Sequence, residues 1–443
     1  MNKLQNRWRE IRQLLTIGWP IIVAQVSQTG MGFVDTLMSG RYGSQDLAAI
    51  AIGSSLWLPV FLAFEGVLMA TTPLVAHQVG AGKLKQTRDI FAQGCVIALA
   101  LGFIAIILLH NTLPVLAWMS VEPALAEKTA RYLAAISWGF PAIMLYQVIR
   151  SFSEGFGKTH PIMIIAIFAL LANIPLNYLF IYGKLGLPEL GGVGCGWASS
   201  LVMWLTLGAG LIYIKTSHTF KPCELFAHRR LPGLQQLNYF LRLGLPIGLT
   251  LLIEVSMFAI IALLLADLGE TIVAAHQITI SFTGMVFMIP LSIAMALTIR
   301  IGHRLGGNNK QGACYSASTG VLITLICATL SSTLMFLFAA QIATLYTSDQ
   351  AIILIAAELI TIAAVFQFSD AIQVACAGAL RGYRDTTIPL GMVFVAYWMI
   401  GLPLGFILAR KDWIVPAMGP QGFWISLVIA LTLAAIMLGA RLF

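Results

Sequence analysis

Charged residues are scarce in this chain of 443 residues: they make up 10%, against about 25% in soluble domains. The six cysteines show no CxxC spacing, so neither a zinc site nor a disulfide framework is indicated. The sequence also lacks the P-loop pattern, the HExxH zinc motif and the GxSxG nucleophile motif. These absences argue against a soluble domain, an ATP-driven pump built from this chain alone, and an enzyme.

Long apolar runs dominate instead, and 59% of the residues are apolar. A helix needs about 20 apolar residues to cross the hydrocarbon core of a membrane. Twelve such runs are predicted, starting near Leu14, Ala51, Phe91, Arg131, Pro161, Val193, Tyr239, Ile272, Ala313, Ala351, Pro389 and Gly422. The pattern predicts an all-α integral membrane protein with twelve transmembrane helices.

The net charge of +8 needs an explanation, because basic proteins often bind nucleic acid. If the N-terminus is cytoplasmic, 20 of the 26 Lys and Arg residues fall on the cytoplasmic side and 6 on the other. The positive-inside rule accounts for such a bias, so we expect both termini in the cytoplasm and no nucleic-acid partner. The first apolar run is long enough to remain as a span, and no cleavable signal peptide is predicted.

An internal repeat divides the chain into two halves, with a shift of about 226 residues that becomes 228 further along. The matched pairs include Gly18 with Gly244, Pro20 with Pro246, His77 with His303, Pro161 with Pro389, and Pro175 with Pro403. Each half holds six spans, so both copies enter the membrane in the same direction. We therefore expect two pseudo-symmetric six-helix bundles (residues 1–214 and 239–443), joined by a cytoplasmic linker (215–238), with a substrate site between them near the midplane.

Three acidic residues inside apolar runs, Asp35, Glu254 and Asp370, are the first candidates for function. A charge at the membrane centre costs about 2.5–3.5 kcal/mol, and such residues mark ion or proton paths. The acids do not repeat between the halves, and Glu254 corresponds to Gln28. We predict that Glu254 and Asp370 share a site for Na⁺ or H⁺, because paired carboxylates can hold either. The alternative is a structural pair of protonated acids.

Two asparagines form a second candidate group. Asn173 and Asn177 are four residues apart, hence on one helix face, and can join Asp35 in a polar pocket of the first half. Asparagines also hold helices together in lipid, which is the simpler alternative. For Asp35 the alternative is a pair with Arg41 at the outer interface.

Three further residues complete the candidate substrate cavity. Glu65 lies within the second span without a charged neighbour in sequence, and cavity lining and an interfacial position are equally compatible with this. Phe282 and Phe287 can stack on planar cations, although packing against lipid or the protein core is the simpler explanation.

Several tracts are similar to one known family. QVSQTGMGFVDTLMSG, NIPLNYLFIYGKLGLPELGGVGCGWA and LRGYRDT resemble multidrug and toxic compound extrusion (MATE) transporters of the NorM type, and the resemblance runs from Leu14 to the last span. It implies two six-helix bundles around a central cavity, export of organic cations such as dyes and fluoroquinolones, coupling to Na⁺ or H⁺ without any cofactor, and a functional monomer in a bacterial inner membrane. The family's membrane acids fall on Asp35, Glu254 and Asp370, and its asparagine pair on Asn173 and Asn177. Glu65 lies outside the family pattern.

The mechanism expected from these features is antiport by alternating access. Two alternatives belong to other classes: a flippase for lipid-linked precursors, which needs a cationic cavity for phosphates, and a metabolite symporter built from two bundles.

Overall fold

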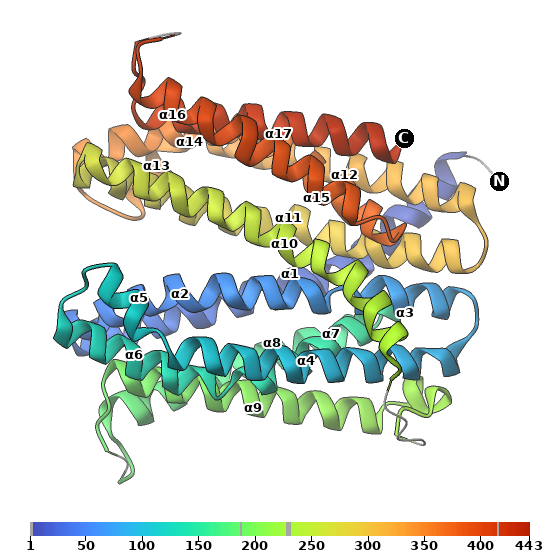
Figure 1. Cartoon of the computed structure of the whole chain (residues 1–443). Coiled ribbons are helices and arrows are strands. Elements are labelled where there is room, and N and C mark those ends of the chain that lie inside the picture. Colours follow the sequence, from blue (N-terminus) through green and yellow to red (C-terminus); the bar gives the residue numbers. More distant parts are fainter. Residues whose placement is uncertain (1–2, 187, 227–231, 414–415) are drawn as a thin grey trace. The chain divides into compact units, whose positions relative to one another are not determined.

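The computed structural model describes residues 3–186, 188–226, 232–413 and 416–443, and over these ranges the chain forms helices and no strands (Figure 1). The predicted all-α membrane fold is confirmed. The chain divides into two compact units: unit 1 is Met1–Trp19 with Leu249–Phe443, and unit 2 is Pro20–Gly248.

Two long helices pass from one unit to the other. α1 (Lys3–Tyr42) does so at Pro20, and α10 (Leu234–Leu265) does so at Leu249, close to Pro246. The boundaries between the units therefore lie within α1 and α10, whereas the repeat predicted one boundary at the linker 215–238. The start of each copy packs with helices of the other: Leu14 lies in a core cluster of unit 1, and Phe240 lies in the core of unit 2.

Unit 2 is a bundle of helices around one hydrophobic core. Besides parts of α1 and α10, it comprises α2 (Ser44–Leu68), α3 (Thr71–Gly80), η1 (Leu84–Gln86), α4 (Thr87–His110), α5 (Leu113–Trp118), α6 (Pro123–Ser137), α7 (Phe140–Gly155), α8 (His160–Tyr182), α9 (Gly192–Thr216) and η2 (His218–Cys223).

Unit 1 repeats this plan with longer, less interrupted helices. It comprises the remaining parts of α1 and α10 with η3 (Ala266–Leu268), α11 (Glu270–Gly306), α12 (Lys310–Leu337), α13 (Ala339–Thr344), α14 (Gln350–Gly382), α15 (Thr387–Phe394), the π-helix η4 (Val395–Gly401), α16 (Leu402–Arg410) and α17 (Pro420–Leu442). Its largest fully buried side chain is Trp424 of α17.

All twelve predicted spans coincide with helical segments. Ten helical segments of the described chain are long and apolar enough to cross a membrane, and α6 with α7, bent by 45°, can form an eleventh. The α1 helix is not among them, and its apolar run from Leu14 is interrupted by the polar residues Gln25, Ser27, Gln28 and Thr29. Length and composition thus support ten or eleven spans. The remaining predicted span, which starts near Leu14, lies within α1.

The sequence repeat is visible in individual contacts. In unit 2, Thr72 Oγ1 donates a hydrogen bond to the carbonyl of Ser151 at 3.3 Å; in unit 1, Thr298 Oγ1 donates one to the carbonyl of Gly378 at 2.7 Å. These residues occupy corresponding places in the two copies. The repeated glycines serve the same packing: a Cβ on Gly155 or on Gly382 would lie 2.8 Å from a side-chain Cβ of the facing helix, closer than real Cβ atoms approach. Close helix approach therefore explains why these glycines occur twice.

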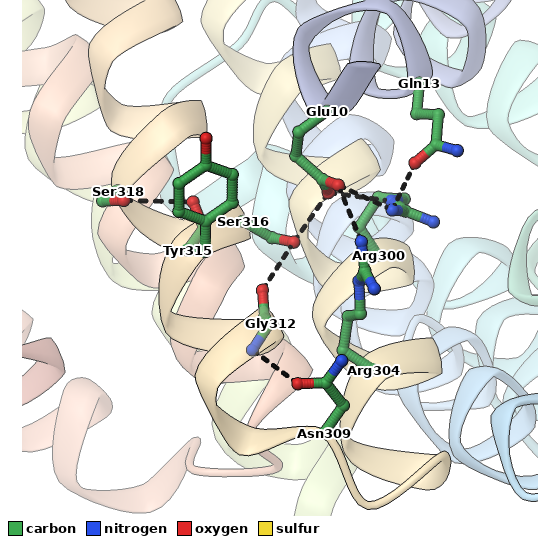
Figure 2. A network of polar contacts seen from close by, with 9 residues as sticks. All are labelled: Glu10, Gln13, Arg300, Arg304, Asn309, Gly312, Tyr315, Ser316 and Ser318. Atoms are coloured by element: carbon green, nitrogen blue, oxygen red, sulfur yellow. Dashed lines mark hydrogen bonds and ion pairs between the residues drawn. The ribbon is translucent and has the colours of Figure 1, made fainter. Parts of the chain in front are cut away.

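A buried ion-pair network holds the start of α1 in unit 1 (Figure 2). Arg300 binds Glu10 in bidentate fashion, with Nε–Oε1 and Nη2–Oε2 distances of 3.0 and 2.8 Å. Arg304 Nη2 donates to Oε2 at 3.0 Å, and Ser316 Oγ donates to Oε1 at 2.6 Å. Glu10 is 2% exposed. Burial alone raises the pKa of Glu10, but the hydrogen bonds from Arg300, Ser316 and Arg304 outweigh it, so the pKa lies below its usual value.

Glu10→Gln is expected to destabilise the folded protein by about 2 kcal/mol at neutral pH, because it removes hydrogen bonds that involve a charged group. The lowered pKa of Glu10 means that its contribution is present above the unfolded-state pKa near 4.5 and is lost as the pH falls through the folded-state pKa. Thermal unfolding of purified protein at several pH values checks this. The gap between wild type and Glu10→Gln should narrow below about pH 4.5; a gap that is constant with pH contradicts the role of the charge.

Candidate functional site

Asp35 lies in unit 2 among polar side chains from α8 and α9. Its Oδ1 accepts hydrogen bonds from Asn173 Nδ2 at 3.0 Å and Asn177 Nδ2 at 2.6 Å, and its Oδ2 accepts one from Ser199 Oγ at 3.1 Å. Asn177 Nδ2 also donates to Asn173 Oδ1 at 3.1 Å. The structure thus brings together Asp35 and both asparagines, and it adds Ser199, which the sequence analysis missed.

The geometry of α8 places the two asparagines. The helix carries Pro161 in its first turn and ends at Gly183, whose φ of +62° is the left-handed conformation common at helix C-termini. Pro175 lies between the asparagines and lacks the N–H that a helix interior normally uses. Both asparagine side chains are buried on the face toward Asp35, with 1% and 0% exposure.

The electrostatics of this group are unusual because the donors to Asp35, which are Asn173, Asn177 and Ser199, are uncharged. Over the described ranges no ion pair joins Asp35 to Arg41, so the interfacial pair considered from the sequence is not formed. Asn177 Oδ1 is buried and has no hydrogen-bond partner within the described part of the chain. A carboxylate beside an unused amide oxygen can receive a proton or a small hard cation.

Glu254 and Asp370 lie in unit 1 on α10 and α14. Gln373, one turn after Asp370, donates from Nε2 to Glu254 Oε1 at 2.9 Å. The carboxylates of Glu254 and Asp370 lie within range of each other's charge. Tyr397 of η4 is 2% exposed and lies within the field of both. π-helices often occur at functional sites, and here the π-helix contains a buried tyrosine within range of the charges of both acids.

The surroundings of these acids limit what can bind. Arg381, two turns beyond Gln373 on α14, interacts with Glu254 at long range, and its Nε has no hydrogen-bond partner within the described ranges. Among the residues that the structure describes, no group of three or more His, Cys, Asp or Glu side chains could hold a metal ion. Carboxylate, amide and phenol oxygens suit a proton or a hard cation such as Na⁺.

Glu65 has a partner that its sequence neighbourhood does not contain. It is 9% exposed, accepts a hydrogen bond from Gln147 Nε2 at 2.9 Å, and lies 3.7 Å from Arg150 Nη1. Arg150 also binds Glu154 at 2.9 Å. The structure thus places Glu65 in a buried charge cluster.

The two phenylalanines proposed for substrate stacking are placed differently. Phe282 packs against the core of unit 1, whereas Phe287 is partly exposed and is not part of that core. Core packing therefore accounts for Phe282.

The site residues missed by the sequence analysis share one property: none is an isolated acid in an apolar run. Ser199, Gln373 and Tyr397 are common residues in membrane helices. Arg150 and Glu154 lie at the end of an apolar run, where charges normally mark the interface. Their i, i+4 spacing is the one available signal, since it places opposite charges on one helix face.

Comparison with known proteins agrees with this architecture. A family model described as MatE matches twice, over residues 20–179 and 246–407, which start and end at the repeat shifts found in the sequence. Among curated proteins, the chain is 44% identical to "Multidrug resistance protein NorM" of Photobacterium profundum over 99% of this chain and 96% of that protein. It is also 44% identical to "Multidrug resistance protein PmpM" of Pseudomonas aeruginosa over 98% of this chain and 91% of that protein.

The fold is similar to that of solved transporters. The crystal structure of the eukaryotic MATE transporter AtDTX14 superposes with a TM-score of 0.90 at 20% identity, covering 98% of this chain and 96% of that chain. An outward-facing multidrug resistance MATE family transporter gives a TM-score of 0.87 at 20% identity, with 98% and 96% covered. At this identity the likeness concerns the fold.

Proposed function

The chain belongs to the MatE family, and we propose that it is a multidrug efflux antiporter that exports organic cations in exchange for Na⁺ or H⁺. The observation that carries the proposal is that two acid sites lie within apolar helices and that, over the described part of the chain, Asp35 and Glu254 accept hydrogen bonds from uncharged side chains. The names of the 44% identical relatives support multidrug export. We place the protein in a bacterial inner membrane with both termini in the cytoplasm.

The chemistry of the acids supplies a mechanism. A buried carboxylate without a paired cation is costly, so each site gains free energy when a proton or cation neutralises it. An ion that enters from outside and binds at Glu254 and Asp370 favours the state that releases drug outward. Inward movement of one charge at 100 mV adds about 2.3 kcal/mol. Drug and ion alternate because each stabilises a different state of the same carrier.

The function is tested by efflux from proteoliposomes with Na⁺ and pH gradients imposed separately. We expect export of ethidium, a planar organic cation, under at least one of the gradients, and little export of an anionic dye of similar size. Equal transport of the anionic dye contradicts a cation exporter and favours the flippase. Inward co-transport of a metabolite with the ion favours the symporter.

The orientation is tested by labelling single cysteines in a cysteine-free protein. Lys221→Cys, exposed in η2, is expected to react in intact cells only with a membrane-permeant thiol reagent, because the positive-inside rule places it in the cytoplasm. Lys184→Cys, exposed after α8, is the matched control on the predicted outer side and should react with an impermeant reagent. Impermeant labelling at position 221 reverses the topology.

A further inference from the structure

A buried charge cluster in unit 2 is not used by the two acid sites described above. It contains Arg150 and Glu154 of α7 and Glu65 of α2, which are 4%, 1% and 9% exposed. The guanidinium donates from Nε to Glu154 Oε1 at 2.9 Å, from Nη2 to Gln25 Oε1 at 2.9 Å and from Nη1 to Gln28 Oε1 at 3.5 Å. One cation therefore connects α1, α2 and α7.

The cluster holds two carboxylates and one guanidinium, so one negative charge is in excess in apolar surroundings. The two acids are not equivalent. Glu154 has a direct charge-assisted hydrogen bond, whereas Glu65 lies 3.7 Å from Nη1 and accepts a bond from the neutral Gln147. The Glu65 side chain keeps 12% of its surface accessible, and that of Glu154 keeps 2%. Glu65 is thus the carboxylate that is held less tightly and can exchange a proton.

An independent observation points to a missing hydrogen-bond partner. The hydroxyl of Tyr146 is buried, has no partner within the described residues, and lies within the field of Arg150 and Glu154. Buried polar groups are nearly always satisfied, so an unpaired hydroxyl beside the cluster marks a place for an exchangeable proton donor or water. Among the described residues, the ionisable groups that interact with one another in the cluster are Glu65 of α2 and Tyr146, Arg150 and Glu154 of α7. The α1 side chains that contact the cluster are the uncharged amides of Gln25 and Gln28.

The internal repeat indicates what the cluster can bind. Gln28 and Glu254 occupy corresponding positions in the two copies. In unit 1 this position is a carboxylate with an uncharged hydrogen-bond partner, which suits an external cation. In unit 2 it is an amide bound to the guanidinium of Arg150. The fixed positive charge of the guanidinium repels a metal cation, but it does not prevent protonation of the excess carboxylate.

We propose that Glu65 is a proton-binding site of the transport cycle, in addition to the acids at 35, 254 and 370; this inference rests on the proposed antiport. A hydronium ion gives its proton to the carboxylate and leaves as water, so the carboxylate becomes a neutral acid. The cluster then has one carboxylate and one guanidinium. Both observed contacts of Glu65 use Oε1, so Oε2 can take the proton without breaking the bond from Gln147. When Glu65 loses its charge, the remaining polar contacts of Arg150 are those with Glu154 and with Gln25 and Gln28 of α1. The charge state of α2 is thereby transmitted to α1.

Infrared titration of the purified protein tests proton binding without any transport. We expect one component of the protonated-carboxyl absorption to titrate in wild type and to be missing from the spectrum of Glu65→Gln, while the components of the other acids remain. Glu358→Gln is the matched control, because Glu358 is exposed and bonded only to the neutral Gln421 among its observed contacts, and it should retain this component. Arg150→Gln should increase the protonated-carboxyl absorption, since both acids then lack a cation. An unchanged absorption in Glu65→Gln, with the protein folded, overturns the proposal.

Efflux from proteoliposomes provides the second measurement. Glu65→Gln is expected to lose ethidium efflux driven by a pH gradient alone. The infrared result separates the two hypotheses: if wild type exports nothing, the antiport proposal fails while Glu65 still titrates. If wild type exports ethidium under a pH gradient and Glu65→Gln does so equally well, the role of Glu65 in the cycle is refuted.

Discussion

Glu254→Gln is expected to abolish ion-driven efflux while the protein remains folded in the membrane. Glutamine keeps the size of the side chain, and its carbonyl oxygen can accept the same hydrogen bond from Gln373 that Glu254 Oε1 accepts at 2.9 Å. Only the charge is lost. Removing one charge from a buried ionic contact costs about 2–5 kcal/mol, which is a loss of roughly 30-fold or more in affinity for the coupling ion.

The measurement is binding of radioactive sodium, or isothermal titration with Na⁺ and H⁺, on purified protein, together with efflux from proteoliposomes. Asp370→Asn should behave like Glu254→Gln, and the double variant should be no worse than either one, since groups that act as a unit do not have additive effects. Glu358→Gln, on the same helix as Asp370, serves as the control. Normal ion binding and efflux by Glu254→Gln would show that these acids are structural.

Asp35→Asn is expected to eliminate most of the efflux with little change in stability. The carbonyl oxygen of asparagine can accept the bonds that Asn173 and Asn177 now donate to Oδ1. Its amide group can donate to Ser199, whose hydroxyl can rotate from donor to acceptor. The hydrogen-bond network is therefore preserved, and the variant removes the only formal charge among these four side chains.

Asp35→Ala separates charge from hydrogen bonding. It leaves the donors of the two asparagines and Ser199 without their acceptor, and unsatisfied buried groups cost about 1–3 kcal/mol each. We expect Asp35→Ala to lower the melting temperature more than Asp35→Asn, although both lose efflux. Full efflux by Asp35→Asn, measured per folded molecule, excludes a role for the charge.

Much of the fold was predictable because membrane helices follow simple rules. Apolar length predicted twelve spans, each of which coincides with a helical segment, although ten or eleven segments of the described chain are long and apolar enough to cross a membrane. The recurring Gly and Pro residues predicted the two copies. The repeated bonds of Thr72 and Thr298 show that the copies share their internal packing as well. The contact of Asp35 with Asn173 and Asn177 was also predictable. The two asparagines are four residues apart and so lie on one helix face, and the depth of Asp35 in the membrane limits its possible partners.

The remaining features depend on contacts between residues far apart in sequence. Glu65 and Gln147 are 82 residues apart, and nothing local to Glu65 predicts the Arg150 partner. The passage of α1 and α10 between units was likewise not predictable, because hydropathy records that a helix is apolar but not which helices it packs against. The π-helix at Val395–Gly401 was missed because one extra residue per turn leaves no clear mark in composition.

The pairing of Glu10 with Arg300 has a consequence for biosynthesis. The two residues are 290 positions apart in sequence. At a rate of protein synthesis of about 5–20 residues per second, Arg300 is therefore made roughly 15–60 s after Glu10. Throughout that interval a newly made acid has no partner, and Met1–Trp19 lacks the unit to which it belongs. A nascent chain that stops before α11 is therefore incomplete at its beginning as well as at its end.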